Sequence, residues 1–300
     1  MKLIDGPDEI VELPLSDPLA AIRTIRFHQL DLLVDLGPWP RLNAVLAWAA
    51  NSAFTVGFRT AGQFRHYAYD VAVEHSRLRH ELDNYRALLE SLGIGSRNSP
   101  AMKFSPANEI HEVEGCEPFV VFHPWAGGFK GHLREWQNEK WSMLAREMIG
   151  LGYHVVLTGA REEVKKNEEI VNTESPNSRG WMVNAAGLSL RRSLEMVRRA
   201  SLVVSVNTGI MHVAAAIGAP LVALHGPTSI VRWGPIDENA INIVPSVPGH
   251  GYLNLGFEYP RHPPPCMEHI EYSRVRDACC EKLAAQGRVR PQSESCADVG

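Results

Sequence analysis

Residues 205–212, SVNTGIMH, have the composition and order of an anion-binding turn. A continuous apolar run at residues 202–204 predicts a buried strand, and the turn leads directly into a predicted helix. The N-terminus of a helix offers free backbone N–H groups and the positive end of its dipole to a phosphate. Gly209 allows a phosphate to approach the backbone, Thr208 adds a hydroxyl, and a neutral His212 can donate one hydrogen bond. A capped helix whose histidine faces the core is the alternative interpretation.

Two further turns follow predicted strands. Gly226 and Thr228 come directly after the apolar run at residues 221–224. In an open parallel sheet, ligands bind beyond the carboxyl ends of the strands, so this turn could form a wall of the same crevice. Thr158 and Gly159 end another predicted strand, in a pattern typical of a turn near a base or a ribose. The alternatives are a tight turn at the first position and a solvated, charged helix face after the second.

A glycine loop follows the apolar strand predicted at residues 119–122. Residues 123–136, HPWAGGFKGHLREW, contain three glycines together with Lys130, His132 and Arg134. Such a loop can fold over a diphosphate, and its lysine or arginine would neutralise the charge that develops on a leaving phosphate. A solvated surface loop is the alternative.

Several other chemistries lack their motifs. The sequence contains no G-x-G-x-x-G, no G-x-x-x-x-G-K-[ST] and no G-x-S-x-G, which are typical of nicotinamide dehydrogenases, P-loop NTPases and α/β-hydrolases. Cys266 and His269 have a C-x-x-H spacing, but no second pair matches it. We therefore predict no metal site and no cofactor.

In this order, the segments resemble glycosyltransferase family 9, the ADP-heptose:lipopolysaccharide heptosyltransferases. The resemblance rests on FVVFHPWAGG…LREW, on VVLTGAREE, and on a block that runs from NAAGLSLRRSLEMVRRASLVVSVNTGIMHVAAAIGAPLVALHGPTS to RWGP. DLLVDLGPWPRLNAVLAW and ALLESLGI resemble the first domain of the family. The resemblance covers about residues 5–285 and is strongest at residues 119–235.

The resemblance implies an α/β, GT-B-like architecture, in which two Rossmann-like domains with parallel sheets face each other across a cleft. The C-terminal domain would hold a nucleotide-diphosphate sugar of the ADP-heptose type, with Thr208, Gly209 and His212 at its phosphates and sugar. Lys130 or Arg134 would assist the leaving diphosphate. The N-terminal domain would hold a saccharide or lipid-linked acceptor, at the inner membrane surface. The family inverts the anomeric centre and needs no divalent metal.

The sequence departs from the family pattern at two places. Asn207 stands where family members usually carry Asp, which keeps the shape but removes a charge. Family members also open with a strand, a glycine-containing turn with the Asp expected as general base, a helix and a second strand, whereas this chain begins about where the third strand would be. The first domain is therefore predicted to be incomplete, and the catalytic residue is unknown. Asp35 is one candidate base, with an Asx turn or a helix cap as the alternative.

Alternating strands and helices are predicted to position these turns. The first part has predicted strands at residues 8–13, 32–34 and 69–73 and helices at 41–50 and 79–92. The second part has predicted strands at residues 119–122, 155–157, 181–183, 202–204, 221–224 and 241–244, with helices between them and a last helix at 274–283. We predict an N-terminal domain at residues 1–99, a linker at 100–117, a C-terminal domain at 118–250, a return segment with a final helix at 251–285, and a disordered tail at 286–300.

The amino-acid composition and charge of the chain limit the classes of partner that it could bind and the compartment in which it could lie. The 300 residues are 45% hydrophobic and 21% charged, which excludes disorder as a description of the whole chain. The net charge is −4, so no basic excess indicates nucleic acid. The N-terminal residues MKLIDGPDEI lack the apolar core of a signal peptide, and the five cysteines are irregularly spaced. These features predict a cytoplasmic protein.

The sequence as a whole predicts an inverting glycosyltransferase. It would move a sugar, expected to be a heptose, from a nucleotide-diphosphate donor to a saccharide or lipopolysaccharide-core-type acceptor. Three alternatives stay open: a non-catalytic nucleotide-sugar binder or truncated copy, a nucleotide-sugar epimerase on the same architecture, and an α/β interaction module without a ligand.

Overall fold

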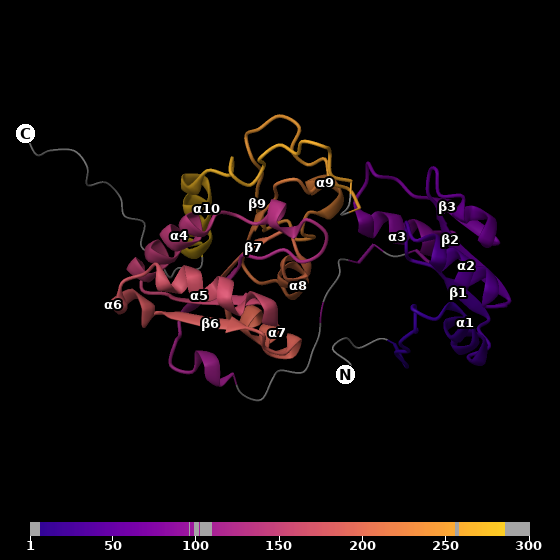
Figure 1. Cartoon of the computed structure of the whole chain (residues 1–300), viewed down its shortest axis with the longest axis horizontal. Helices are drawn as coiled ribbons and strands as arrows, with labels where there is room; N and C mark the ends of the chain where they lie inside the picture. Colours follow the sequence, from indigo (N-terminus) through magenta and orange to yellow (C-terminus); the bar gives the residue numbers. More distant parts are fainter. Residues whose placement is uncertain (1–6, 96, 99–101, 103–109, 256–257, 286–300) are drawn as a thin grey trace, which may run out of the picture. The chain divides into compact units, whose positions relative to one another are not determined.

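The chain divides into two compact units, Gly6–Asn98 and the residues from Ser99 onward, in a computed structural model (Figure 1). The structure describes residues 7–95, 97–98, 102, 110–255 and 258–285. The predicted tail at residues 286–300 and much of the predicted linker lie outside the described residues. Among the described residues, no helix is long and apolar enough to cross a membrane.

The N-terminal unit has a parallel three-stranded sheet with the order β1-β2-β3. Its elements are α1 (Pro18–Phe27), β1 (Leu32–Val34), α2 (Arg41–Ala49), β2 (Phe54–Arg59), the short helix η1 (Arg65–Ala68), β3 (Val71–Glu74) and α3 (Glu81–Glu90). The helix α2 packs Ala44 and Ala47 on one face of the sheet, and α3 packs Leu88 on the other. The predicted parallel strand at residues 32–34 and the predicted helix at 41–50 are confirmed.

Two predictions about this unit are wrong. Residues 8–13 form no strand; instead Leu13 packs against the cluster of α1 and α2. The strand β1 is not fully buried, because Leu32 is 42% exposed. The two differences are linked: since residues 8–13 do not pair with β1, only β2 does so among the described residues, and β1 lies at the edge of the sheet, where its side chains are less covered.

The C-terminal unit has a parallel six-stranded sheet with the order β6-β5-β4-β7-β8-β9. Its strands are β4 (Phe119–His123), β5 (His154–Gly159), β6 (Met182–Ala186), β7 (Leu202–Val206), β8 (Leu221–Leu224) and β9 (Ile241–Ile243). Its helices are α4 (Asn138–Gly150), α5 (Val164–Asn172), α6 (Pro176–Arg179), α7 (Leu190–Arg199), α8 (Gly209–Ile217), α9 (Ile230–Trp233) and α10 (Tyr272–Ala284), with the short 3-10 turns η2 (His111–Val113), η3 (Gly131–Arg134) and η4 (Arg161–Glu163).

Helices cover both faces of this sheet. Side chains of α4, α5 and α10 pack on one face, and those of α7 and α8 pack on the other. Ile110 and Val113 also lie in the second of these cores. The strand order reverses between β4 and β7, and ligands of doubly wound sheets bind at the carboxyl ends of the strands at such a reversal. The glycine loop follows β4, and the SVNTGIMH turn follows β7.

The glycine loop is packed tightly at one of its glycines. A Cβ atom on Gly131 would overlap the backbone carbonyl of Ala126, whereas a Cβ on Gly127 would meet nothing within 4 Å. We expect Gly131→Ala to lower the free energy of unfolding by about 1–3 kcal/mol, because a backbone atom cannot move aside cheaply. Gly127→Ala is the matched control and should change it by less than about 0.5 kcal/mol. Urea unfolding followed by circular dichroism measures both, and equal values for the two variants would contradict the prediction.

Candidate functional site

A pocket of about 230 Å³ lies beyond the carboxyl ends of β7 and β8. Six of the ten residues predicted for donor binding line it: Arg134, Asn207, Thr208, Gly209, His212 and Thr228. Trp233, Leu253 and Leu255, which the sequence did not indicate, complete the lining. The structure therefore brings the SVNTGIMH turn, the Gly226–Thr228 turn and the glycine loop to one place.

The start of α8 leaves its polar groups available to a ligand. Thr208 is the N-cap residue and has an extended backbone, but its side chain caps nothing. The hydroxyl oxygens of Thr208 and Thr228 are buried and have no hydrogen-bond partner among the described residues. Gly209, the first helical residue, is exposed and has open space where a Cβ would lie. Since buried hydroxyls normally have partners, two of them beside free helical N–H groups indicate an anion site.

Asn207 turns its amide nitrogen away from solvent. The amide nitrogen, Nδ2, lies 2.9 Å from the carbonyl oxygen of Trp233 and 3.1 Å from Nδ1 of His225. His225 is fully buried, and its Nε2 lies 2.9 Å from Oδ1 of Asn242 on β9. Burial lowers the pKa of His225 to about 4, so the imidazole is neutral at physiological pH.

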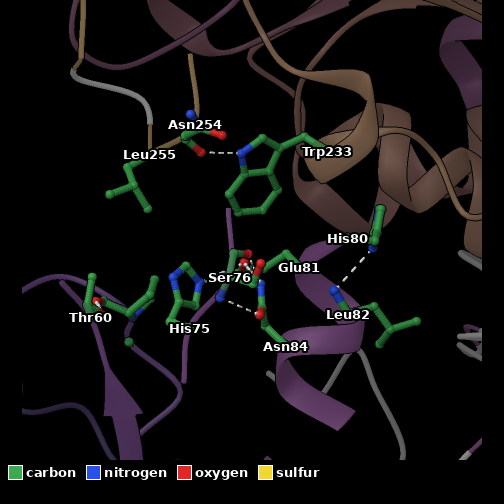
Figure 2. A network of polar contacts seen from close by, with 12 residues as sticks. Thr60, His75, Ser76, His80, Glu81, Leu82, Asn84, Trp233, Asn254 and Leu255 are labelled. Carbon is green, nitrogen blue, oxygen red and sulfur yellow. Dashed lines mark hydrogen bonds and ion pairs between the residues drawn. The ribbon is translucent and has the colours of Figure 1, made fainter. Parts of the chain in front are cut away.

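Trp233 forms a wall of the pocket. Its indole N–H donates to the backbone carbonyl of Asn254, as Figure 2 shows. The segment around Leu253 is also held in place, because the backbone N–H of Leu253 donates to the carbonyl of Pro227 at 2.7 Å. The ring of His212 lies edge-on to that of Trp233, with centroids 6.5 Å apart. These contacts hold the apolar side of the pocket in place.

The two basic candidates of the glycine loop differ. Arg134 lines the pocket, and its guanidinium also donates to the carbonyl of Gly127. Lys130 is exposed and does not line the pocket; its ammonium lies over the rings of Phe129 and Tyr259, 5.6 and 5.4 Å from their centroids. Arg134 is therefore the better placed of the two to hold a phosphate.

Thr158, Gly159 and Gly226 do not line this pocket either. The Thr158 hydroxyl donates to the carbonyl of Phe122 at 3.2 Å and accepts from Nδ1 of His123 at 2.9 Å. A Cβ on Gly226 would overlap the sulfur of Met267, so this glycine serves close packing. The structure gives all three residues a place in the framework of the unit.

Asp35, the predicted candidate for the general base, is engaged in an ion pair. Its Oδ2 lies 2.5 Å from a guanidinium nitrogen of Arg65 and accepts from the Tyr69 hydroxyl at 2.6 Å. Its Oδ1 accepts from the backbone N–H of Gly37 at 2.8 Å, which is an Asx turn. Burial, followed by the bond to Asp35, raises the pKa of Tyr69. The turn interpretation is therefore the one that the geometry favours.

A second polar cluster of the N-terminal unit was missed by the sequence analysis. Beyond the carboxyl end of β3, Nε2 of His75 lies 3.1 Å from Oε2 of Glu81, and both side chains are 3% exposed. Asn84 donates to the same carboxylate at 3.1 Å and to the carbonyl of Ser76 at 2.9 Å (Figure 2). Nothing in the spacing of these residues distinguishes them from ordinary helix-start residues. Among the described residues, no group of three or more His, Cys, Asp or Glu could hold a metal ion.

The buried His225 makes stability depend on pH. Its pKa is about 4 in the folded chain and about 6.5 in the unfolded one, so the unfolded chain binds more protons between these values. The free energy of unfolding should therefore fall as the pH drops from 6.5 to 4, by about 2 kcal/mol at pH 5 from this residue. Urea unfolding of wild type and His225→Phe at pH 7.5 and pH 5 tests this. The variant lacks the titration, so an equal pH effect in both proteins would refute the prediction.

A family model described as glycosyltransferase family 9 (heptosyltransferase) matches residues 19–248. The chain belongs to glycosyltransferase family 9. It is 33% identical over 127 residues to lipooligosaccharide heptosyltransferase 2 of Haemophilus influenzae, which is 42% of this chain and 36% of that protein. It is 28% identical over 163 residues to lipopolysaccharide heptosyltransferase 2 of Escherichia coli K12, which is 54% of this chain and 44% of that protein. The alignments thus span less than half the length of these two relatives.

Solved structures of heptosyltransferases share the fold of this family 9 chain. The structure of E. coli ADP-heptose LPS heptosyltransferase II has a TM-score of 0.67 at 21% identity, over 92% of this chain and 83% of that one. The E. coli heptosyltransferase WaaC with ADP has a TM-score of 0.64 at 16% identity, over 89% and 77%. The predicted α/β, GT-B-like fold with two Rossmann-like, parallel-sheet units is therefore confirmed.

Proposed function

We propose that this family 9 chain is an inverting glycosyltransferase that moves a heptose from an ADP-heptose-type donor to a saccharide or lipopolysaccharide-core-type acceptor. The observation that carries the proposal is the pair of unpartnered hydroxyls, Thr208 and Thr228, beside the free start of α8. The nature of the donor is supported by the relatives, which include a heptosyltransferase solved with ADP. The acceptor would be held by the N-terminal unit and presented at the inner membrane surface, on its cytoplasmic side.

In this reaction, the chief role of the C-terminal pocket is to stabilise the negative charge of the leaving nucleoside diphosphate. An acceptor hydroxyl attacks the anomeric carbon on the face opposite the diphosphate, so a new C–O bond forms while the bond to the phosphate oxygen breaks. The electron pair of the broken bond stays on the leaving nucleoside diphosphate, and the hydroxyl proton passes to a base. Backbone N–H groups of α8, the two threonine hydroxyls and the Arg134 guanidinium are suited to stabilise that charge.

Calorimetry with ADP tests the binding half of the proposal. Wild type is expected to bind ADP, and Thr208→Val is expected to bind it about tenfold more weakly, because one hydrogen bond to the phosphate is lost. The thermal unfolding midpoint of Thr208→Val should stay close to that of wild type, since the hydroxyl has no partner within the protein. ADP affinity that does not respond to this substitution would count against the pocket as the donor site.

Transfer is tested separately, with ADP-heptose and a heptose-deficient lipopolysaccharide acceptor. A second candidate function, nucleotide-sugar binding without transfer, is favoured by the engagement of Asp35 with Arg65 and Tyr69, which leaves its carboxylate no free role as a base. Release of ADP only when acceptor is present supports transfer. Tight ADP-heptose binding with neither transfer nor hydrolysis supports the second candidate.

A further inference from the structure

The Asn207 side chain is oriented by its two inner neighbours. The carbonyl oxygen of Trp233, 2.9 Å away, can only accept a hydrogen bond, so the side-chain atom that faces it must be the amide nitrogen. The same nitrogen lies 3.1 Å from Nδ1 of His225. An amide nitrogen has two hydrogens, and these two acceptors are its nearest partners, since the sulfur of Met211 is a weaker acceptor at 3.7 Å.

His225 can accept at Nδ1 only in one tautomer. Its Nε2 lies 2.9 Å from the Oδ1 of Asn242. With the proton on Nε2, the imidazole donates to Asn242 and leaves Nδ1 as an acceptor for Asn207. The lowered pKa of His225 agrees with this neutral form. His225 is fully buried and does not itself line the pocket, so it can act on a ligand only through Asn207.

The remaining polar atom of Asn207 is its carbonyl oxygen. Asn207 lines the pocket, and none of the contacts of this side chain with the described residues involves Oδ1. Oδ1 is therefore the polar atom of this side chain that stays available to a ligand, and it is a neutral hydrogen-bond acceptor. If the amide were turned over, an N–H group would take its place, and a ligand hydroxyl would have to accept instead of donate.

We propose that His225 is a positioning residue, which acts with the carbonyl of Trp233 to hold the Asn207 amide so that Oδ1 faces the pocket and accepts a hydrogen bond from a hydroxyl of the donor sugar. The inference rests on the proposed function, because it names the sugar of the donor as the ligand of Oδ1. It adds a residue behind the pocket that controls recognition of the sugar but not of the nucleoside diphosphate.

The test measures the affinities for ADP-heptose and for ADP by calorimetry. The affinity for ADP-heptose divided by that for ADP, called the ratio below, gives the contribution of the sugar to binding. His225→Phe keeps a planar ring but removes one of the two acceptors, so the Asn207 amide is oriented by the carbonyl of Trp233 alone and less firmly. We expect the ratio to fall about tenfold in this variant, the equivalent of one hydrogen bond. In His225→Asn, we expect the ratio to stay near the wild-type value, because the amide oxygen of asparagine is an acceptor that can take the place of Nδ1.

Each outcome decides the inference. An unchanged ratio in His225→Phe overturns it, and so does an equal loss in His225→Asn, because a merely structural role of the ring would not depend on an acceptor at this position. If wild type binds neither ADP nor ADP-heptose, the proposed function fails, and with it the sugar as ligand.

The tautomer of His225, on which the orientation of Asn207 depends, is tested without any ligand by long-range ¹H–¹⁵N NMR. The His225 signals are assigned by their loss in His225→Phe, and they must show a protonated Nε2 and an unprotonated Nδ1. The reverse tautomer overturns the inference.

Discussion

Asp35→Ala is expected to lower the free energy of unfolding of the N-terminal unit by about 3–5 kcal/mol. Arg65 is 2% exposed, and the Asp35 carboxylate is the negative charge that lies 2.5 Å from its guanidinium. Removal of the carboxylate leaves a buried positive charge without its counterion and the Tyr69 hydroxyl without its acceptor. Urea unfolding, followed by tryptophan fluorescence and circular dichroism, measures the loss.

The exposed ion pair of the same unit supplies the control. Asp83 lies 2.8 Å from Arg86 on α3, and the Asp83 side chain is 50% exposed. Asp83→Ala should change the free energy of unfolding by less than about 1 kcal/mol, because water screens an exposed pair. If Asp35→Ala unfolds at the same urea concentration as Asp83→Ala, the buried pair does not stabilise the unit. A variant that loses transfer while it keeps full stability would instead return Asp35 to the role of a base.

The C-terminal unit was predictable because its local signals agree with one another. Four of its strands, β4, β5, β7 and β8, contain continuous apolar runs, as is typical of buried parallel strands, and all five residues of β7 are buried. Ser189 caps α7 by accepting from the backbone N–H of Arg192, as its residue type predicts. Gly218 ends α8 with a φ of +78°, which favours glycine over residues with a Cβ. Patterns of this kind act over a few residues, so the sequence alone reveals them.

The N-terminal unit was harder to predict because its sheet is narrow. Its edge strand β1 has only three residues, and its burial differs from that of a central strand. The helix α1, which starts at the Asp17 cap, was not predicted, since its exposed Leu19 and Phe27 blur the apolar stripe. Whether a short apolar segment pairs, packs or stays exposed depends on its neighbours in space, and the sequence of residues 8–13 does not contain that information.

In the candidate site, too, some features follow from the local sequence and others depend on residues that are distant in the sequence. The turn at Asn207, Thr208 and Gly209 follows from a strand that runs into a helix, and its prediction needed no distant residue. Trp233 and His225 were missed because their roles depend on contacts with residues 18 or more positions away in the sequence, such as Asn207. Thr158 illustrates a different difficulty, since a hydroxyl at a strand end can bond to the neighbouring strand as well as to a ligand, and the sequence does not distinguish the two.

Gly209→Asp is expected to weaken ADP binding by at least about a hundredfold without loss of stability. The position is exposed, has open space for a side chain, and is the first residue of α8, where a carboxylate interacts favourably with the helix dipole. The same carboxylate would stand at the proposed diphosphate position, and two like charges about 4 Å apart repel by about 4 kcal/mol at an effective dielectric constant of about 20. Calorimetry measures the affinity, and thermal unfolding measures the stability.

Gly209→Asn separates charge from size, since asparagine has nearly the shape of aspartate and no charge. We expect Gly209→Asn to bind ADP much more tightly than Gly209→Asp does. Added salt should narrow the difference between the two variants, because mobile ions screen a repulsion between partly exposed charges. If the two variants lose affinity equally and salt has no effect, the side chain blocks the pocket by its bulk alone. If Gly209→Asp binds ADP as wild type does, the diphosphate does not lie at the start of α8, because a carboxylate at that position would repel it.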